Sequence, residues 1–204
     1  MMYPDGTIEA LARVVREEAL CEWSQHQLQL MEPQRPRQKP ICLRLRRFDG
    51  VLALSFEQCL EALSEARRKG ETCSCADSWA HLPNWLFPLL RHGEGLRKSC
   101  DYVVCHQKGD TLWVLLIELK SRHGGAASNQ IACTRLLIDY LLNVAAYRAG
   151  LEIVSPEYRG MVFNEKASAP KYRGQPLPYS PAGKAGIRRI TLPRRSYYID
   201  MFCS

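Results

Sequence analysis

The chain has 204 residues, of which 46% are apolar and 24% are charged. This length suits one ordinary domain with a substantial core, and the composition excludes collagen, coiled coil and extended disorder. No apolar run approaches the ~18 residues that a membrane-spanning helix needs. The first residues lack the positive flank and apolar stretch of a signal peptide. We therefore expect no membrane association and a cytoplasmic location.

The charge is strongly basic, with 28 Lys and Arg against 21 Asp and Glu and a net charge of +7. A basic excess is typical of proteins that bind nucleic acid or another polyanion, although it is independent of fold. Nine cysteines are spread along the chain. This odd number in a chain of ordinary size indicates reduced thiols packed as small apolar side chains.

The first third of the chain predicts two helices, a linker and a strand. Apolar residues at three- and four-residue spacing predict a helix from Thr7 to about Leu30. Three prolines and three cations within residues 32–40 predict an extended basic linker, either a solvated connector or an arm along a phosphate backbone. Residues 41–46 alternate apolar and basic, which predicts a strand with one cationic face. Residues 56–69 predict the second helix.

The rest of the chain predicts strands around one long helix. They are two strands joined by a tight turn at Lys108-Gly109, a helix capped by Ser128 or Asn129, and two further strands. Their ranges are 101–107, 111–120, 130–149, 159–163 and 187–192. We expect an α/β (α+β) domain around a mixed sheet. Residues 51–204 would form this domain, and residues 1–50 would add the N-terminal helix, linker and strand.

Charged side chains end the apolar strand 111–120, where a charge is costly unless it is paired or used. Glu118 and Lys120 are two residues apart and therefore project from one face, with Leu119 on the other. A carboxylate and an ammonium in this position suit either an active site or an ion pair that ends a buried strand. The spacing leaves both interpretations open.

Asp101 joins this group if the two strands form a hairpin. With Gln107 opposite Asp110, paired residue numbers sum to about 217, which places Asp101 opposite Leu116 and diagonal to Glu118 on the same face. Two carboxylates and an ammonium at a sheet edge suit a hard divalent cation. Mg²⁺ takes one or two carboxylates and shares the rest of its shell with water and substrate phosphate.

Asp101, sixteen further residues and Glu118-Leu119-Lys120 at the end of an apolar strand resemble the signature of the PD-(D/E)XK nuclease superfamily. The resemblance covers roughly residues 56–163, and Cys100 stands where the signature has proline. It implies a restriction-endonuclease-like core, a mixed sheet flanked by helices in the order α-β-β-β-α-β. It further implies that Asp101, Glu118 and the Leu119 carbonyl bind Mg²⁺ or Mn²⁺, and that Lys120 assists the attacking water.

Further site positions come from the same resemblance. Gln130 resembles the glutamine that several branches place beside the active site, although a glutamine on a first helical turn is equally ordinary. The superfamily usually adds an acidic residue from the first core helix. Glu57 is our first choice, and Glu61, Glu65 and Glu94 are the alternatives. Three glutamates on one helix face are also typical of a solvated helix.

Four cysteines invite comparison with a thiolate metal site. Cys73, Cys75, Cys100 and Cys105 have gaps that fit poorly with the two- to four-residue spacing within each pair of ligands in structural zinc sites. We prefer ordinary buried thiols.

We therefore expect a Mg²⁺-dependent nuclease that hydrolyses DNA, with RNA open as a substrate. The basic stretches 44–47 and 188–195, with Arg122, would hold backbone phosphates without reading sequence. By analogy with the superfamily, the chain would work as the nuclease subunit of a defence or repair complex, beside a protein partner or as a homo-oligomer. The alternative is a catalytically inactive domain of this fold that binds nucleic acid or a partner protein in a larger assembly.

Overall fold

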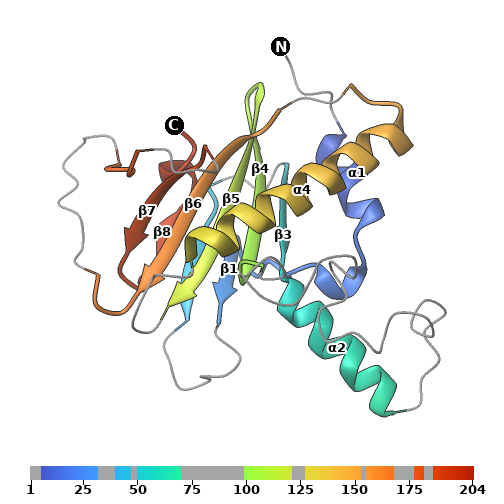
Figure 1. Cartoon of the computed structure of the whole chain (residues 1–204), viewed down its shortest axis with the longest axis horizontal. Helices are drawn as coiled ribbons and strands as arrows, with labels where there is room; N and C mark the ends of the chain where they lie inside the picture. Colours follow the sequence, from blue (N-terminus) through green and yellow to red (C-terminus); the bar gives the residue numbers. More distant parts are fainter. Residues whose placement is uncertain are drawn as a thin grey trace.

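The computed structural model describes residues 6–31, 40–46, 50–69, 99–120, 127–152, 155–167, 177–181 and 186–204. Figure 1 shows the helices and strands along the chain. The helices are α1 (Thr7–Val14), α2 (Phe56–Arg68) and α4 (Ala127–Ala149), with 3-10 turns η1 (Glu17–Ala19) and η2 (Ile199–Met201). The strands are β1 (Gln27–Leu30), β2 (Ile41–Arg44), β3 (Val51–Leu54), β4 (Tyr102–Lys108), β5 (Thr111–Lys120), β6 (Glu157–Asn164), β7 (Arg188–Leu192) and β8 (Tyr197–Tyr198).

Two mixed sheets organise the described part of the chain. The larger has the strand order β3-β4-β5-β6-β7, and the smaller has the order β1-β2-β8. In the larger sheet β3, β4 and β5 are antiparallel neighbours, whereas β5, β6 and β7 run parallel. A parallel pair needs a long crossover, and α4 supplies the one between β5 and β6. The predicted mixed α/β class is confirmed.

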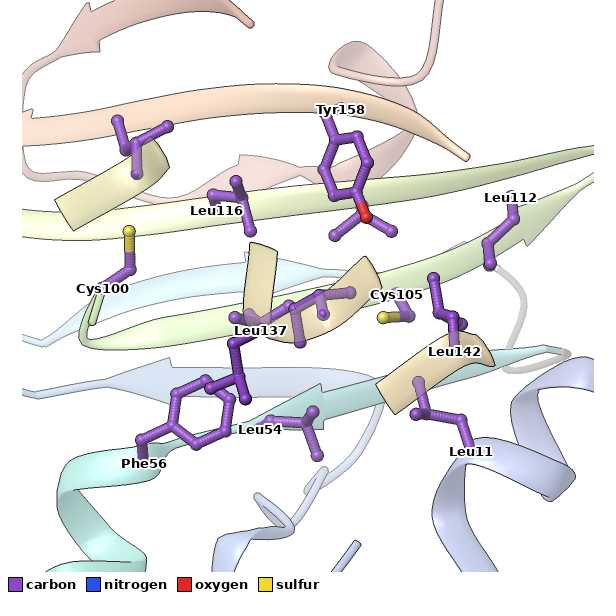
Figure 2. Close-up of a cluster of buried hydrophobic side chains, with 14 of the residues drawn as sticks. Leu11, Leu54, Phe56, Cys100, Cys105, Leu112, Leu116, Leu137, Leu142 and Tyr158 are labelled. Carbon is purple, nitrogen blue, oxygen red and sulfur yellow. The ribbon is translucent and has the colours of Figure 1, made fainter. Parts of the chain in front are cut away.

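The larger sheet buries both of its faces. Along β5, the even-numbered residues from 112 to 116 pack in one core with α1 and α4, and the odd-numbered residues from 113 to 119 pack in a second core against the smaller sheet. Figure 1 shows α4 lying across the first face. In Figure 2, Leu137 and Leu142 of α4 approach Leu54 of β3 and Leu11 of α1 in that core. Residues on both sides of position 50 contribute to both cores.

The predicted helix from Thr7 to Leu30 is wrong beyond Val14, where α1 ends. Val15 is already extended, with φ −94° and ψ 145°. After η1 the chain enters β1, in which the two leucines are buried and pair with β2. The order Gln-Leu-Gln-Leu has the two-residue period of a strand. The backbone N–H and C=O groups of this segment therefore bond to β2 and not to one another within a helix.

The other predicted elements agree with the structure within a few residues. The strand at 41–46 is β2, the helix at 56–69 is α2, and the last two strands are β6 and β7. The long helix begins at Ala127, so Ser128 and Asn129 lie in its first turn and are not its cap. The short strands β3 and β8 were not predicted. The predicted linker, apart from Pro40, lies outside the described residues.

Among the described residues, no helix is both long enough and apolar enough to span a membrane.

Candidate active site

Asp101 and Glu118 face each other at the open end of the β4–β5 hairpin. Tyr102 pairs with Ile117, so paired residue numbers sum to 219 instead of the predicted 217. One more step along this register places Asp101 opposite Glu118. The prediction was wrong because the turn starts one residue later, with Gly109 at φ 57° as its first residue, a conformation that favours glycine. A shift of two leaves the face unchanged, so both acids project toward the α4 side.

Glu118 is the buried acid of the site, with 1% of its surface exposed. Its Oε1 forms an ion pair with Lys120 Nζ, and among the described residues its Oε2 has no hydrogen-bond partner. Burial raises the pKa of Glu118, and the Lys120 ammonium opposes that rise. A buried carboxylate oxygen without a partner is unusual in a folded protein. The Gln130 side chain and the Asp101 N–H lie near enough to oppose the rise in the pKa of Glu118. Neither makes a well-aligned hydrogen bond to Oε2, which therefore keeps acceptor capacity for a cation or a proton.

Asp101 is held by the backbone of the neighbouring strand. Its Oδ2 accepts a hydrogen bond from the Leu119 N–H at 2.6 Å. The Leu119 side chain is buried in the opposite core, as the strand period predicts. The structure therefore connects Leu119 to the site through its N–H, and the metal-binding role of its carbonyl stays a prediction.

Gln130 enters the site from the first turn of α4. Lys120 Nζ donates to Gln130 Oε1 at 3.0 Å, and Gln130 Nε2 donates to the Ser99 carbonyl at 3.3 Å. One turn later, the fully buried Thr134 accepts a hydrogen bond from the Cys100 N–H at 2.6 Å and donates to the Gln130 carbonyl at 2.8 Å. These bonds attach the start of α4 to the residues that precede β4.

Sequence reasoning missed Thr134, although a signal for it exists. It is a polar residue on the buried stripe of α4, four residues after Gln130 and so on the same side of the helix. A buried hydroxyl needs a partner. The partner here is a backbone N–H beside Asp101, which only the fold brings near.

The predicted acidic residues upstream of the hairpin do not complete the site in the described structure. Glu61 and Glu65 are exposed on α2, and Glu65 pairs with Lys69 at 3.0 Å. Figure 1 shows α2 extending away from the larger sheet. The Glu57 side chain and Glu94 lie outside the described residues. Across the described segments, no three His, Cys, Asp or Glu side chains are close enough to share a metal ion.

The cysteines of the described segments are free, and burial disfavours the thiolate forms of the two candidate ligands among them, Cys100 and Cys105. Burial raises the pKa of Cys105 to about 12 and holds that of Cys100 well above its ordinary value. Five residues of extended chain separate the two, roughly 16 Å, and Figure 2 shows them apart within the core. They cannot share one ion. The other two candidate thiols, Cys73 and Cys75, lie outside the described residues.

Comparison of the whole chain with protein-family models, curated proteins and solved structures found no match. The functional interpretation therefore depends on the chemistry of the site itself.

Proposed function

We propose that this protein is a Mg²⁺-dependent nuclease that hydrolyses phosphodiester bonds of DNA, with Asp101, Glu118 and Lys120 at its centre. The observation that carries the proposal is their convergence at the end of β5, where the buried Glu118 Oε2 has no partner among the described residues. Along the chain, α1, β3, β4, β5, α4 and β6 follow in this order, with β1 and β2 inserted before β3 and α2 inserted between β3 and β4. Without these insertions the order is α-β-β-β-α-β, which supports the restriction-endonuclease-like core that the resemblance to the PD-(D/E)XK superfamily implies.

The side chains at the site fit a hard divalent cation. Mg²⁺ takes one or two carboxylates, keeps several waters and shares its remaining positions with phosphate. Asp101 and Glu118 would hold it, and the unpartnered Glu118 Oε2 is a ready ligand. Mn²⁺ prefers similar oxygen ligands. The bound cation would supply positive charge that stabilises the scissile phosphate.

Lys120 contributes a positioned ammonium beside that phosphate. Its Nζ is bonded to both Glu118 and Gln130, which fix its direction, and its side chain is 21% exposed. The ammonium is therefore both oriented and accessible. It orients the attacking water or donates a hydrogen bond to charge that develops on the phosphate. Gln130 acts through Lys120 and is a positioning residue.

Arginines on the surface supply the attraction for a polyanion. Among the described residues of the two basic stretches, the exposed arginines are Arg44, Arg46, Arg188 and Arg195; Arg47 and Arg122 lie outside the described residues. Contacts of this kind hold backbone phosphates and carry no base sequence information. The substrate we propose is therefore DNA held without strong sequence preference.

Plasmid cleavage tests this proposal directly. Wild-type protein should nick or linearise plasmid with Mg²⁺ or Mn²⁺ and should not do so with EDTA. Lys120→Ala should lose this activity, whereas Lys69→Ala should keep it, because Lys69 is an exposed lysine just after α2 that pairs with Glu65. If the wild type cleaves neither DNA nor RNA with any divalent cation, the nuclease proposal fails and the inactive nucleic-acid-binding domain takes its place.

A further inference from the structure

Two adjacent arginines on β7 point to opposite faces of the larger sheet. Ile190 and Leu192 belong to the core against the smaller sheet, and Arg188 shares their parity. Arg189 has the other parity and projects toward the α4 face, which also carries Asp101 and Glu118. Only one of the two arginines therefore lies on the side of the candidate active site.

The strand register gives the distance between Arg189 and that site. Leu116 of β5 pairs with Gly160 of β6, and Gly160 pairs with Arg189 of β7. Arg189 is therefore two strands away from β5 and level with Leu116, which precedes Glu118 by two residues on the same face. With strand spacings of about 4.8 Å and a rise of about 3.3 Å per residue, its Cα is roughly 12 Å from that of Glu118. A long side chain covers much of this separation.

The Arg189 side chain is directed toward the start of α4. Its Nη1 donates a hydrogen bond to Ser128 Oγ, in the helical turn that also carries Gln130. Gly160 lies beside this path: a Cβ at that position would be in ordinary contact with Arg189 Cγ at 3.4 Å and would crowd Ile131 Cδ1 of α4 at 3.1 Å. The guanidinium is therefore held beside the turn that positions Lys120.

The guanidinium keeps capacity for an anion. It has five N–H donors in a planar fork that matches phosphate geometry, and the described hydrogen bond to Ser128 uses one nitrogen, Nη1. Arg189 is half-buried, so its position is constrained without being sealed from solvent.

We propose that Arg189, positioned by Ser128, binds the phosphate next to the scissile one on the β7 side of the site. This inference rests on the proposed nuclease function and refines its substrate. The enzyme acts on a polynucleotide strand with a charged phosphate beside the cut, and a lone phosphodiester lacks this contact. Arg188, on the opposite face, takes no part in it.

The test compares the effect of one neutral linkage in Arg189→Gln and in Arg188→Gln, a pair that removes the same charge from adjacent positions of one strand. Arg188→Gln should lose some of the general attraction for DNA but should keep the effect of the neutral linkage. The substrate is an oligonucleotide in which one linkage is a neutral methylphosphonate, and cutting of each neighbouring linkage is quantified with Mg²⁺. In the wild type and in Arg188→Gln, the neutral linkage should slow cutting of the linkage on one side by about tenfold, the effect of one charge-assisted contact.

Arg189→Gln should cut the unmodified strand about tenfold more slowly than the wild type, and the neutral linkage should add no further loss on that side. Arg189→Lys, which keeps the charge but lacks the planar fork, should recover only part of the rate. Thermal melting of each variant checks that the fold is intact.

An equal effect of the neutral linkage in all three proteins would overturn the role of Arg189 while leaving the nuclease intact. A wild type that cuts nothing would overturn the proposed function as well. The two failures are therefore distinct.

Discussion

Asp101 Oδ2 accepts a hydrogen bond from the backbone N–H of Leu119 at 2.6 Å. This bond joins the residue before β4 to the penultimate residue of β5, so the carboxylate is fixed at the open end of the β4–β5 hairpin independently of any cation. The structural role of Asp101 needs only an acceptor oxygen, whereas a metal site needs its charge. Substitutions at this position can therefore separate folding from chemistry.

Asp101→Asn should abolish Mg²⁺-dependent cleavage and leave the fold intact, because the amide oxygen can still accept from the Leu119 N–H. Asp101→Ala should lose cleavage and also lower the free energy of unfolding by about 1 kcal/mol, since it removes the acceptor. Single-turnover cleavage and denaturant titration measure the two effects. If Asp101→Asn cuts at the wild-type rate, the catalytic centre lies elsewhere.

Glu118 should make stability depend on pH in the absence of metal. Burial raises its pKa above the ordinary value of 4.5, so the folded state keeps a proton that the unfolded state has released. Unfolding free energy should therefore fall as pH rises from that value through the raised pKa. Glu118→Gln should lack this decline. Melting of both proteins in EDTA from about pH 4 to about pH 8 checks this, and a wild-type profile parallel to that of Glu118→Gln would refute it.

Metal binding should show the opposite dependence on pH. A cation needs the ionised carboxylate, so Mn²⁺ affinity should rise as pH rises through the pKa of Glu118. Calorimetry of the wild type at several pH values measures the trend, and Asp101→Ala is the control that should bind Mn²⁺ weakly throughout. A Mn²⁺ affinity independent of pH would exclude Glu118 as a ligand.

Lys120→Ala should separate turnover from binding. One aimed donor at developing charge contributes on the order of 3 kcal/mol, about a hundredfold in rate. Lys120 is only one of 28 lysines and arginines, so its loss should scarcely weaken the general attraction for DNA. Single-turnover cleavage beside a DNA-binding titration in Ca²⁺ gives both quantities. Equal losses in the two assays would make Lys120 a structural ion-pair partner only.

Gly160→Ala should destabilise the protein by about 1–3 kcal/mol, because the new methyl group would crowd Ile131 Cδ1 at 3.1 Å. Ile131→Val removes that carbon. The double variant should therefore be more stable than the sum of the two single effects predicts, by about 0.5 kcal/mol or more. Denaturant titration of the four proteins completes the cycle. Strict additivity would show that Gly160 does not control the approach of α4 to the sheet.

Affinity for duplex DNA should fall steeply as salt is added, with little discrimination between sequences. Arginine contacts to phosphates release counterions, so the logarithm of the binding constant should decrease linearly with the logarithm of salt concentration. Fluorescence anisotropy with two unrelated duplexes measures both properties. Tight binding to only one of them, or binding insensitive to salt, would contradict this expectation.

Local periodicity was sufficient for much of the site. The alternation along residues 111–120 placed Glu118 and Lys120 on one face and Leu119 on the other, because side-chain direction in a strand depends only on parity. The same property kept Asp101 on the correct face, although the predicted register placed it opposite Leu116, two residues from its partner Glu118. The predicted N-terminal helix was too long, because the few apolar residues beyond Val14 fit the period of a helix as well as that of a strand. Pairing with β2 selected the strand for residues 27–30.

The contacts of the site depended on tertiary structure. Gln130 reaches Lys120, and Thr134 reaches the Cys100 N–H, only because α4 packs back over the strands that precede it. Arg189 shares the face of Glu118 because β7 is parallel to β6 in a definite register. The order of residues determines which side chains share a face, at a spacing of two residues in a strand and three or four in a helix. Contacts between distant segments depend on how two buried faces pack, which is a property of the whole fold.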